Sequence, residues 1–138
     1  MEYRRLTGTD LDRLWELQLA YKAEIGEAAP SGPDRERLRE AVDRDAICFY
    51  GAWDGALLVG VCSVTLAFST FLYAPSGIFE DFYIRPPYRH KGIARELVRF
   101  ARQESGAASL TVGCAACDAA MYEALGFSVP LGRLLAFA

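Results

Sequence analysis

Apolar residues recur near the start of the chain at the three- and four-residue intervals of one helix face. Thr9, followed three residues later by Asp12, has the spacing of a capping box, so we predict that a helix begins there. Residues 26–33 contain two prolines and two glycines and predict a loop, and residues 38–42 then indicate a second, shorter helix. The apolar positions of the first helix are Leu11, Leu14, Trp15, Leu17, Tyr21 and Ile25.

Two continuous apolar runs follow these helices and predict strands. Residues 46–53 and 56–66 are separated by Asp54 and Gly55, a strong signal for a two-residue hairpin. A type I′ turn needs positive φ at both central positions, which these two residue types tolerate. We therefore expect the two strands to be antiparallel neighbours.

The second half of the chain alternates strand-like and helical patterns. We expect a loop at residues 67–77 and a strand at residues 78–84, which ends before Pro86 and Pro87 because proline cannot donate to a ladder. A helix with one apolar face is expected to begin at or near Gly92. The pattern then predicts a strand at 109–112, a helix at 118–125 closed by Gly126, and two strand-like pieces at 127–137 around Pro130.

This order of elements predicts an α/β fold with a mixed sheet, in which helices follow only some of the strands. The chain has 138 residues, 52% of them hydrophobic, which is enough to build a core. No internal repeat or linker interrupts it. We expect a single domain spanning residues 1–138.

Composition narrows the classes of partner. With 15 Lys and Arg against 18 Asp and Glu, the chain has no overall positive field to bind nucleic acid. No apolar run approaches the roughly 18 to 20 residues that span a bilayer, and the first residues lack an apolar signal core. We therefore expect a cytoplasmic protein with no nucleic acid or membrane partner.

Four cysteines are present, and Cys114 and Cys117 have C-x-x-C spacing. No second pair with ligand spacing exists, and Cys48 and Cys62 lie in apolar, strand-like runs. A closed zinc site needs four ligands. We expect no metal, and buried or partly buried free thiols.

The segment between the third strand and the following helix concentrates positive charge. Arg89, His90 and Lys91 precede Gly92, and His90 is the only histidine of the chain. The N–H groups at a helix N-terminus lack intrahelical partners and carry partial positive charge, which favours a phosphate or pyrophosphate. Gly92 lets the backbone approach such a ligand without a Cβ in the way. A solvated cationic turn is the alternative.

The motif "RHKGIA" at residues 89–94 is similar to the R-x-x-G-x-G/A signature of the GNAT acyltransferases, and "YEALGF" at 122–127 resembles their late Y-x-x-x-G-F element. The order of elements resembles that family over essentially the whole chain. The resemblance implies a mostly antiparallel central sheet flanked by helices and splayed at an acyl-CoA site. Acetyl-CoA would be the co-substrate, bound by Phe82, Tyr83, Ile84, Arg89, His90, Lys91, Gly92, Ile93, Ala94 and Arg95.

A shorter match, "FSTF" at 68–71 followed by "FEDFYI" at 79–84, resembles the diamine acetyltransferase branch. The chain departs from the family pattern at Ala115, where an asparagine is frequent. Cys114, Cys117 or Asp118 could take over its contacts.

The resemblance implies the catalytic groups. Acyl transfer needs a neutral amine, and deprotonating an alkylammonium of pKa near 10.4 at pH 7 costs roughly 4 to 5 kcal/mol. Glu80 is the expected base, acting through water. Asp81 would face the other side of a regular strand unless the strand bulges. Tyr122 is the expected acid for the leaving thiolate, and Cys114 could instead be acylated first.

The acceptor is expected to be a primary amine of a small molecule, a polyamine or an amino acid. Tyr21, Glu24, Phe71 and Asp81 are the candidate acceptor-binding residues, although a solvated acidic face would explain the carboxylates equally well. The alternatives are a non-catalytic acyl-CoA sensor or interaction subunit, and a protein or peptide N-acetyltransferase. A homodimer is a further alternative.

Overall fold

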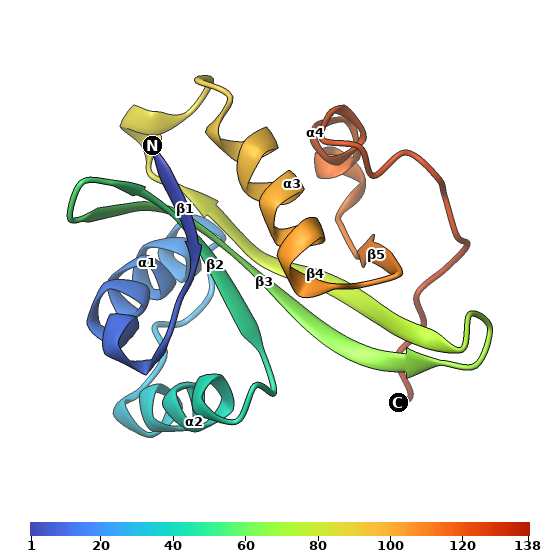
Figure 1. Cartoon of the computed structure of the whole chain (residues 1–138), viewed down its shortest axis with the longest axis horizontal. Helices are drawn as coiled ribbons and strands as arrows, with labels where there is room; N and C mark the ends of the chain where they lie inside the picture. Colours follow the sequence, from blue (N-terminus) through green and yellow to red (C-terminus); the bar gives the residue numbers. More distant parts are fainter.

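A computed structural model describes all residues, 1–138, and its centre is one five-stranded sheet (Figure 1). The strands lie in the order β1-β2-β3-β4-β5, antiparallel except for the parallel pair β4 and β5. The mostly antiparallel mixed sheet expected from the sequence is confirmed. The elements are β1 Glu2–Arg5, α1 Leu11–Glu24, α2 Gly32–Asp43, β2 Cys48–Asp54, β3 Leu57–Ser69, β4 Ala74–Ile84, α3 Ile93–Ser105, β5 Ser109–Val112 and α4 Ala119–Ala124. No helix is long and apolar enough to cross a membrane.

Two apolar clusters hold the helices on opposite faces of the sheet. On one face, Leu14 and Leu17 of α1 pack with Phe49 of β2. On the other, Leu97 and Val98 of α3 belong to a separate cluster. Because both faces of the central strands are covered, their sequences form continuous apolar runs instead of an alternating pattern.

The hairpin between β2 and β3 forms, but its turn lies one residue later than expected. Asp54 pairs with Leu57, so Gly55 and Ala56 are the two loop residues. Only Gly55 has positive φ, at 58°. The predicted type I′ turn at Asp54 and Gly55 is therefore wrong, because Asp54 remains in the strand.

The loop expected at residues 67–77 is also wrong. β3 continues to Ser69 and β4 begins at Ala74, which leaves only a short turn. Gly77, the last residue of the expected loop, lies in β4, where an added Cβ would come within 2.9 Å of Leu110 and 3.1 Å of Val64. This glycine is required by close packing between strands.

The two strands expected at residues 127–137 do not form. Pro130 lacks a donor, and Gly132 has φ of 102°, so neither continues a ladder. β5 is consequently the outermost strand of the sheet. The apolar residues that suggested strands are at least 76% exposed: Val129, Leu131, Leu134, Leu135 and Phe137.

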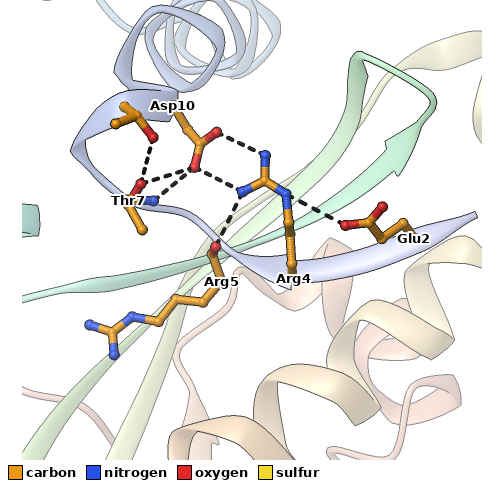
Figure 2. Close-up of polar contacts among 6 residues, drawn as sticks. Glu2, Arg4, Arg5, Thr7 and Asp10 are labelled. Carbon is orange, nitrogen blue, oxygen red and sulfur yellow. Dashed lines mark hydrogen bonds and ion pairs between the residues drawn. The ribbon is translucent and has the colours of Figure 1, made fainter.

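A 3-10 turn at Gly8–Asp10 leads into α1, and the capping box lies at the start of this turn instead of at Thr9 and Asp12, where it was expected. The N–H of Thr7 donates to Asp10 Oδ2 at 2.9 Å, so the capping pair is Thr7 and Asp10. Arg4 of β1 donates to both oxygens of Asp10 at 2.9 Å (Figure 2). The guanidinium also lies 4.2 Å from the centre of the Trp53 ring. Asp10, only 8% exposed, thereby ties the sheet edge to the helix.

Asp10→Asn should destabilise the protein by about 1–3 kcal/mol, because Arg4 then loses a charged, bidentate partner. The Arg4 hydrogen bond lowers the pKa of Asp10, so its stabilising effect is present at neutral pH and is lost as pH falls through that lowered pKa. The difference in urea unfolding free energy between wild type and variant should therefore shrink in acid. Asp12→Asn, in an exposed ion pair with Arg35, is the matched control and should cost little. Equal losses in the two variants would contradict this assignment.

Candidate active site

A β-bulge in β4 determines where its carboxylates lie. Val61 pairs with Tyr83 and Ser63 with Glu80, so two steps along β3 correspond to three steps along β4. Asp81 takes the left-handed conformation that such an insertion requires, with φ of 51°. A non-glycine residue held there is strained, which is typical of functional sites.

The bulge places both Glu80 and Asp81 on the face covered by α1. Ser63 pairs with Glu80 and with Phe49, whose side chain packs against α1. The hydroxyl of Ser63 donates to Asp81 Oδ2 at 2.7 Å, so Asp81 lies on the same face. From the sequence, we expected Glu80 and Asp81 to lie on opposite faces unless the strand bulged; the strand bulges, and both lie on the α1 face.

Tyr21 and Lys22 of α1 lie over these carboxylates. Burial raises the pKa of the Tyr21 hydroxyl, and the charges of Asp81 and, more weakly, Glu80 raise it further. Lys22 Nζ lies 5.3 Å from the centre of the Tyr21 ring. Tyr21 therefore lies close to Asp81 and Glu80. Sequence reasoning missed Lys22 and Ser63; the available signal for Ser63 was a hydroxyl inside an apolar strand.

Next to the bulge, β4 and β5 separate. Their pairing is confined to Ser76–Phe79 and Ser109–Val112, so Tyr83 and Ile84 have partners only on β3, and Phe82 has a partner on neither strand. The splayed edge expected from the sequence is present. Unpaired backbone groups on this side of β4 can bind an extended ligand such as a pantetheine arm.

The basic turn lies at the end of the splayed edge and leads into α3. Gly92 is the N-cap residue, with φ of 82°, and His90 also has positive φ, at 59°. Successive residues of this kind form a concave arrangement of N–H groups that suits an anion. An added Cβ on Gly92 would meet nothing within 4 Å, so space for a ligand exists there. His90, Lys91 and Arg95 are exposed, whereas Ile93 is buried in the core and offers only its backbone.

Arg89 does not present a free guanidinium to this concave surface. Its Nε donates to the carbonyl oxygen of Ile84 at 2.8 Å, and its Nη2 donates to Glu24 of α1 at 2.6 Å. Glu24, a candidate for binding the acceptor, therefore holds the basic turn against α1. In this arrangement the backbone N–H groups and Lys91 are the groups left to bind a phosphate.

Gly92→Asn should weaken acetyl-CoA binding at least tenfold, since asparagine tolerates positive φ but adds a side chain where the pyrophosphate would lie. Gly106→Asn is the matched control, because Gly106 caps the other end of α3 with φ of 69° and has equally open surroundings. Both variants should melt at similar temperatures. Isothermal titration with acetyl-CoA measures the difference, and equal affinities in the two variants would remove the phosphate site.

Tyr122 of α4 reaches the same region from the side of the split sheet. Its ring lies 6.3 Å from that of Phe82 and 5.9 Å from that of Phe127, so it packs against both aromatic side chains. Burial raises the pKa of Tyr122 to about 12, with further contributions from Tyr21, Asp118 and Cys114. The hydroxyl is therefore protonated at physiological pH and can donate a hydrogen bond.

This raised pKa changes the expected role of Tyr122. Donating its proton fully to a thiolate of pKa near 8.5 would cost about 5 kcal/mol, more than an unperturbed tyrosine would require. A hydrogen bond to the leaving sulfur, without complete transfer, has no such cost.

Two further expectations concern side chains elsewhere. Phe71 is 98% exposed at the turn of the β3–β4 hairpin, roughly 20 Å along β4 from Glu80, and does not line the site. Cys114 and Cys117 are exposed, so the expectation of buried or partly buried thiols holds only for Cys48 and Cys62. No group of three or more His, Cys, Asp or Glu side chains is arranged to hold a metal ion.

Solved structures of acetyltransferases share this fold. A probable acetyltransferase superposes with a TM-score of 0.86 at 22% identity, covering 100% of this chain and 99% of its own. An aminoglycoside acetyltransferase from an uncultured soil metagenomic sample superposes with a TM-score of 0.83 at 18% identity, covering 99% of this chain and 93% of its own. A predicted acetyltransferase from Clostridium acetobutylicum, solved with acetyl-CoA, superposes with a TM-score of 0.75 at 15% identity, covering 99% of this chain and 95% of its own. No curated protein sequence matches the chain.

Sequence comparison identifies the family. The acetyltransferase (GNAT) domain matches residues 45–129, well over half of the chain. This protein belongs to the GNAT acetyltransferase family. The diamine branch suggested by the shorter motif is not among these findings.

Proposed function

We propose that this protein transfers an acetyl group from acetyl-CoA to a primary amine of a small molecule, by direct attack in a ternary complex. The observation that carries the proposal is the β4 bulge. It places two carboxylates on the α1 face beside the point where β4 and β5 separate. The family and the open space at Gly92 support acetyl-CoA as the donor.

The chain's own groups would act at defined atoms. Glu80 is exposed and makes no hydrogen bond within the protein, so its carboxylate can accept the ammonium proton through water. Asp81, held by Ser63, would orient the amine. The amine nitrogen then forms a bond to the thioester carbonyl carbon, the C–S bond breaks, and the second proton that the nitrogen loses passes through water to the departing sulfur, so that coenzyme A leaves as the thiol. The Tyr122 hydroxyl would donate a hydrogen bond to the departing sulfur.

An assay of free CoA release from acetyl-CoA tests this proposal against a panel of polyamines, amino acids, hydroxylated amines and peptides. Release that depends on a small amine, with the acetylated product identified by mass, supports it. Release only with peptides would assign a protein or peptide acetyltransferase. Binding of acetyl-CoA without release in the presence of any acceptor would assign a sensor.

A further inference from the structure

A cavity of about 640 Å³, wide open to solvent, lies between α1 and α2 and is lined in part by the segment that connects them. Trp15, Leu38 and Ile47 contribute apolar walls. Its volume falls in the range of sites for small molecules. It lies on the same face of the sheet as Glu80 and Asp81, since α1 and Ile47 both pack against the cluster that contains Phe49.

One polar side chain in the cavity wall has no partner. Gln18 of α1 is only 7% exposed and lines the cavity, and its Nε2 makes no hydrogen bond. A buried amide left without a partner costs about 1–3 kcal/mol of stability, so such a group calls for an explanation. Nε2 is shielded from solvent in this rotamer, so a rotation of the side chain that turns the amide toward the cavity would let a ligand oxygen accept from it and supply the missing bond.

The charges around the cavity cancel. Lys22 is paired with Glu27 at 3.2 Å, and Arg37 is paired with Asp34 at 2.7 Å. All four charged residues are therefore paired, and none of them is left to attract a charged group on the ligand in addition to its reacting amine. The part of a ligand that occupies this cavity should be uncharged.

The cavity is close enough to the carboxylates for one molecule to reach both. Ile47 immediately precedes β2, and Phe49, two residues later, pairs with Ser63, which pairs with Glu80. From the spacing of strands and residues, the backbones of Ile47 and Glu80 are about 12 Å apart. Lys22 lines the cavity and lies against Tyr21, so these two side chains stand between the cavity and Asp81.

We propose that this cavity binds the non-reacting part of the acetyl acceptor, and that this part is an uncharged, mainly apolar group carrying a hydroxyl, carbonyl or ether oxygen that accepts from Gln18. The inference rests on the proposed function, because it assigns the substrate class of that same site. The proposal excludes a linear polyamine as the substrate. A polyamine has no oxygen that could accept a hydrogen bond from Gln18, and it would bring a second ammonium group into a cavity without net charge.

Three amines with the same eight-carbon chain, namely octylamine, aminooctanol and diaminooctane, test the proposal on the whole protein chain. Calorimetry with coenzyme A present, where no transfer occurs, measures binding independently of catalysis. Aminooctanol should bind about tenfold more tightly than octylamine, and diaminooctane should bind most weakly. Equal binding of aminooctanol and octylamine, tightest binding of diaminooctane, or no binding of any of the three would overturn the proposal.

Two variants locate the interaction. Gln18→Leu should make aminooctanol and octylamine bind equally and should raise the melting temperature of the free protein, because the unpartnered amide is gone. Ala41→Phe fills the cavity from α2 and should weaken aminooctanol about tenfold without changing coenzyme A affinity. Gln103→Leu, at an exposed position on α3, is the control and should change neither binding nor selectivity. A fall in melting temperature in Gln18→Leu would show that Gln18 only supports α1, which overturns the proposal.

The test also separates this inference from the proposed function. Selective binding of aminooctanol, lost in Gln18→Leu, together with no acetylation of any amine, would retain the cavity and reject the transferase. Acetylation of amines with equal binding of aminooctanol and octylamine would retain the transferase and reject the cavity.

Discussion

Glu80→Gln should lower the turnover of a small primary amine by about two to four orders of magnitude near neutral pH, the usual range for loss of a general base. The loss should decrease as the pH approaches 10.4, near the pKa of the amine, because the neutral amine is then already populated. Steady-state kinetics across that pH range measures the effect. Acetyl-CoA affinity should be unchanged, since the carboxylate lies on the α1 face of β4, away from the basic turn.

Asp81→Asn provides the comparison that assigns the two carboxylates. Asparagine can still accept from Ser63 through its side-chain oxygen, so the bulge should persist. We expect a higher KM for the amine at every pH, with a smaller change in kcat. If the pH-dependent loss appears in Asp81→Asn instead, Asp81 is the base and Glu80 orients the amine. Glu104→Gln, at an exposed position on α3, is the control and should behave like wild type.

Tyr122→Phe should lower turnover by about one to two orders of magnitude, because it removes one hydrogen bond to a charged sulfur, worth roughly 1.5–3 kcal/mol. Packing against Phe82 and Phe127 uses the ring and should survive. The melting temperature and the affinity for acetyl-CoA should therefore change little. Single-turnover kinetics with the best amine separates the transfer step from product release.

The pH dependence of this variant provides a second readout. Since the pKa of Tyr122 is raised to about 12, the wild-type hydroxyl stays protonated up to that pH, and the ratio of wild-type to variant rates should stay constant below it. A ratio that falls between pH 8 and 10 would mean that Tyr122 ionises far earlier than its burial implies. Turnover equal to wild type would leave Tyr122 as a packing residue and direct attention to Cys114, which is exposed and close enough to influence it.

Local signals in the sequence determined most of the order of elements and the position of the basic turn. Helix periodicity, proline and glycine positions and the "RHKGIA" motif are properties of short segments, so they predicted α1, α3, β5 and the glycine at the start of α3 correctly. These local signals were less reliable where the same residue type occurs in two different structural roles. Residues 67–77 were expected to form a loop, but Gly77 at its end serves close strand packing, and the apolar residues after Phe127 indicated strands that find no partner.

Only the tertiary structure decided which side chains meet. The bulge depends on the register between β3 and β4, a relation between distant segments, and it alone brings Asp81 to the face of Glu80. The raised pKa of Tyr122, the engagement of Arg89 by Glu24 and the unpartnered amide of Gln18 likewise depend on burial and on contacts between elements. Burial and strand register arise when separate segments pack together, so the sequence could nominate the chemical groups of this site but could not place them.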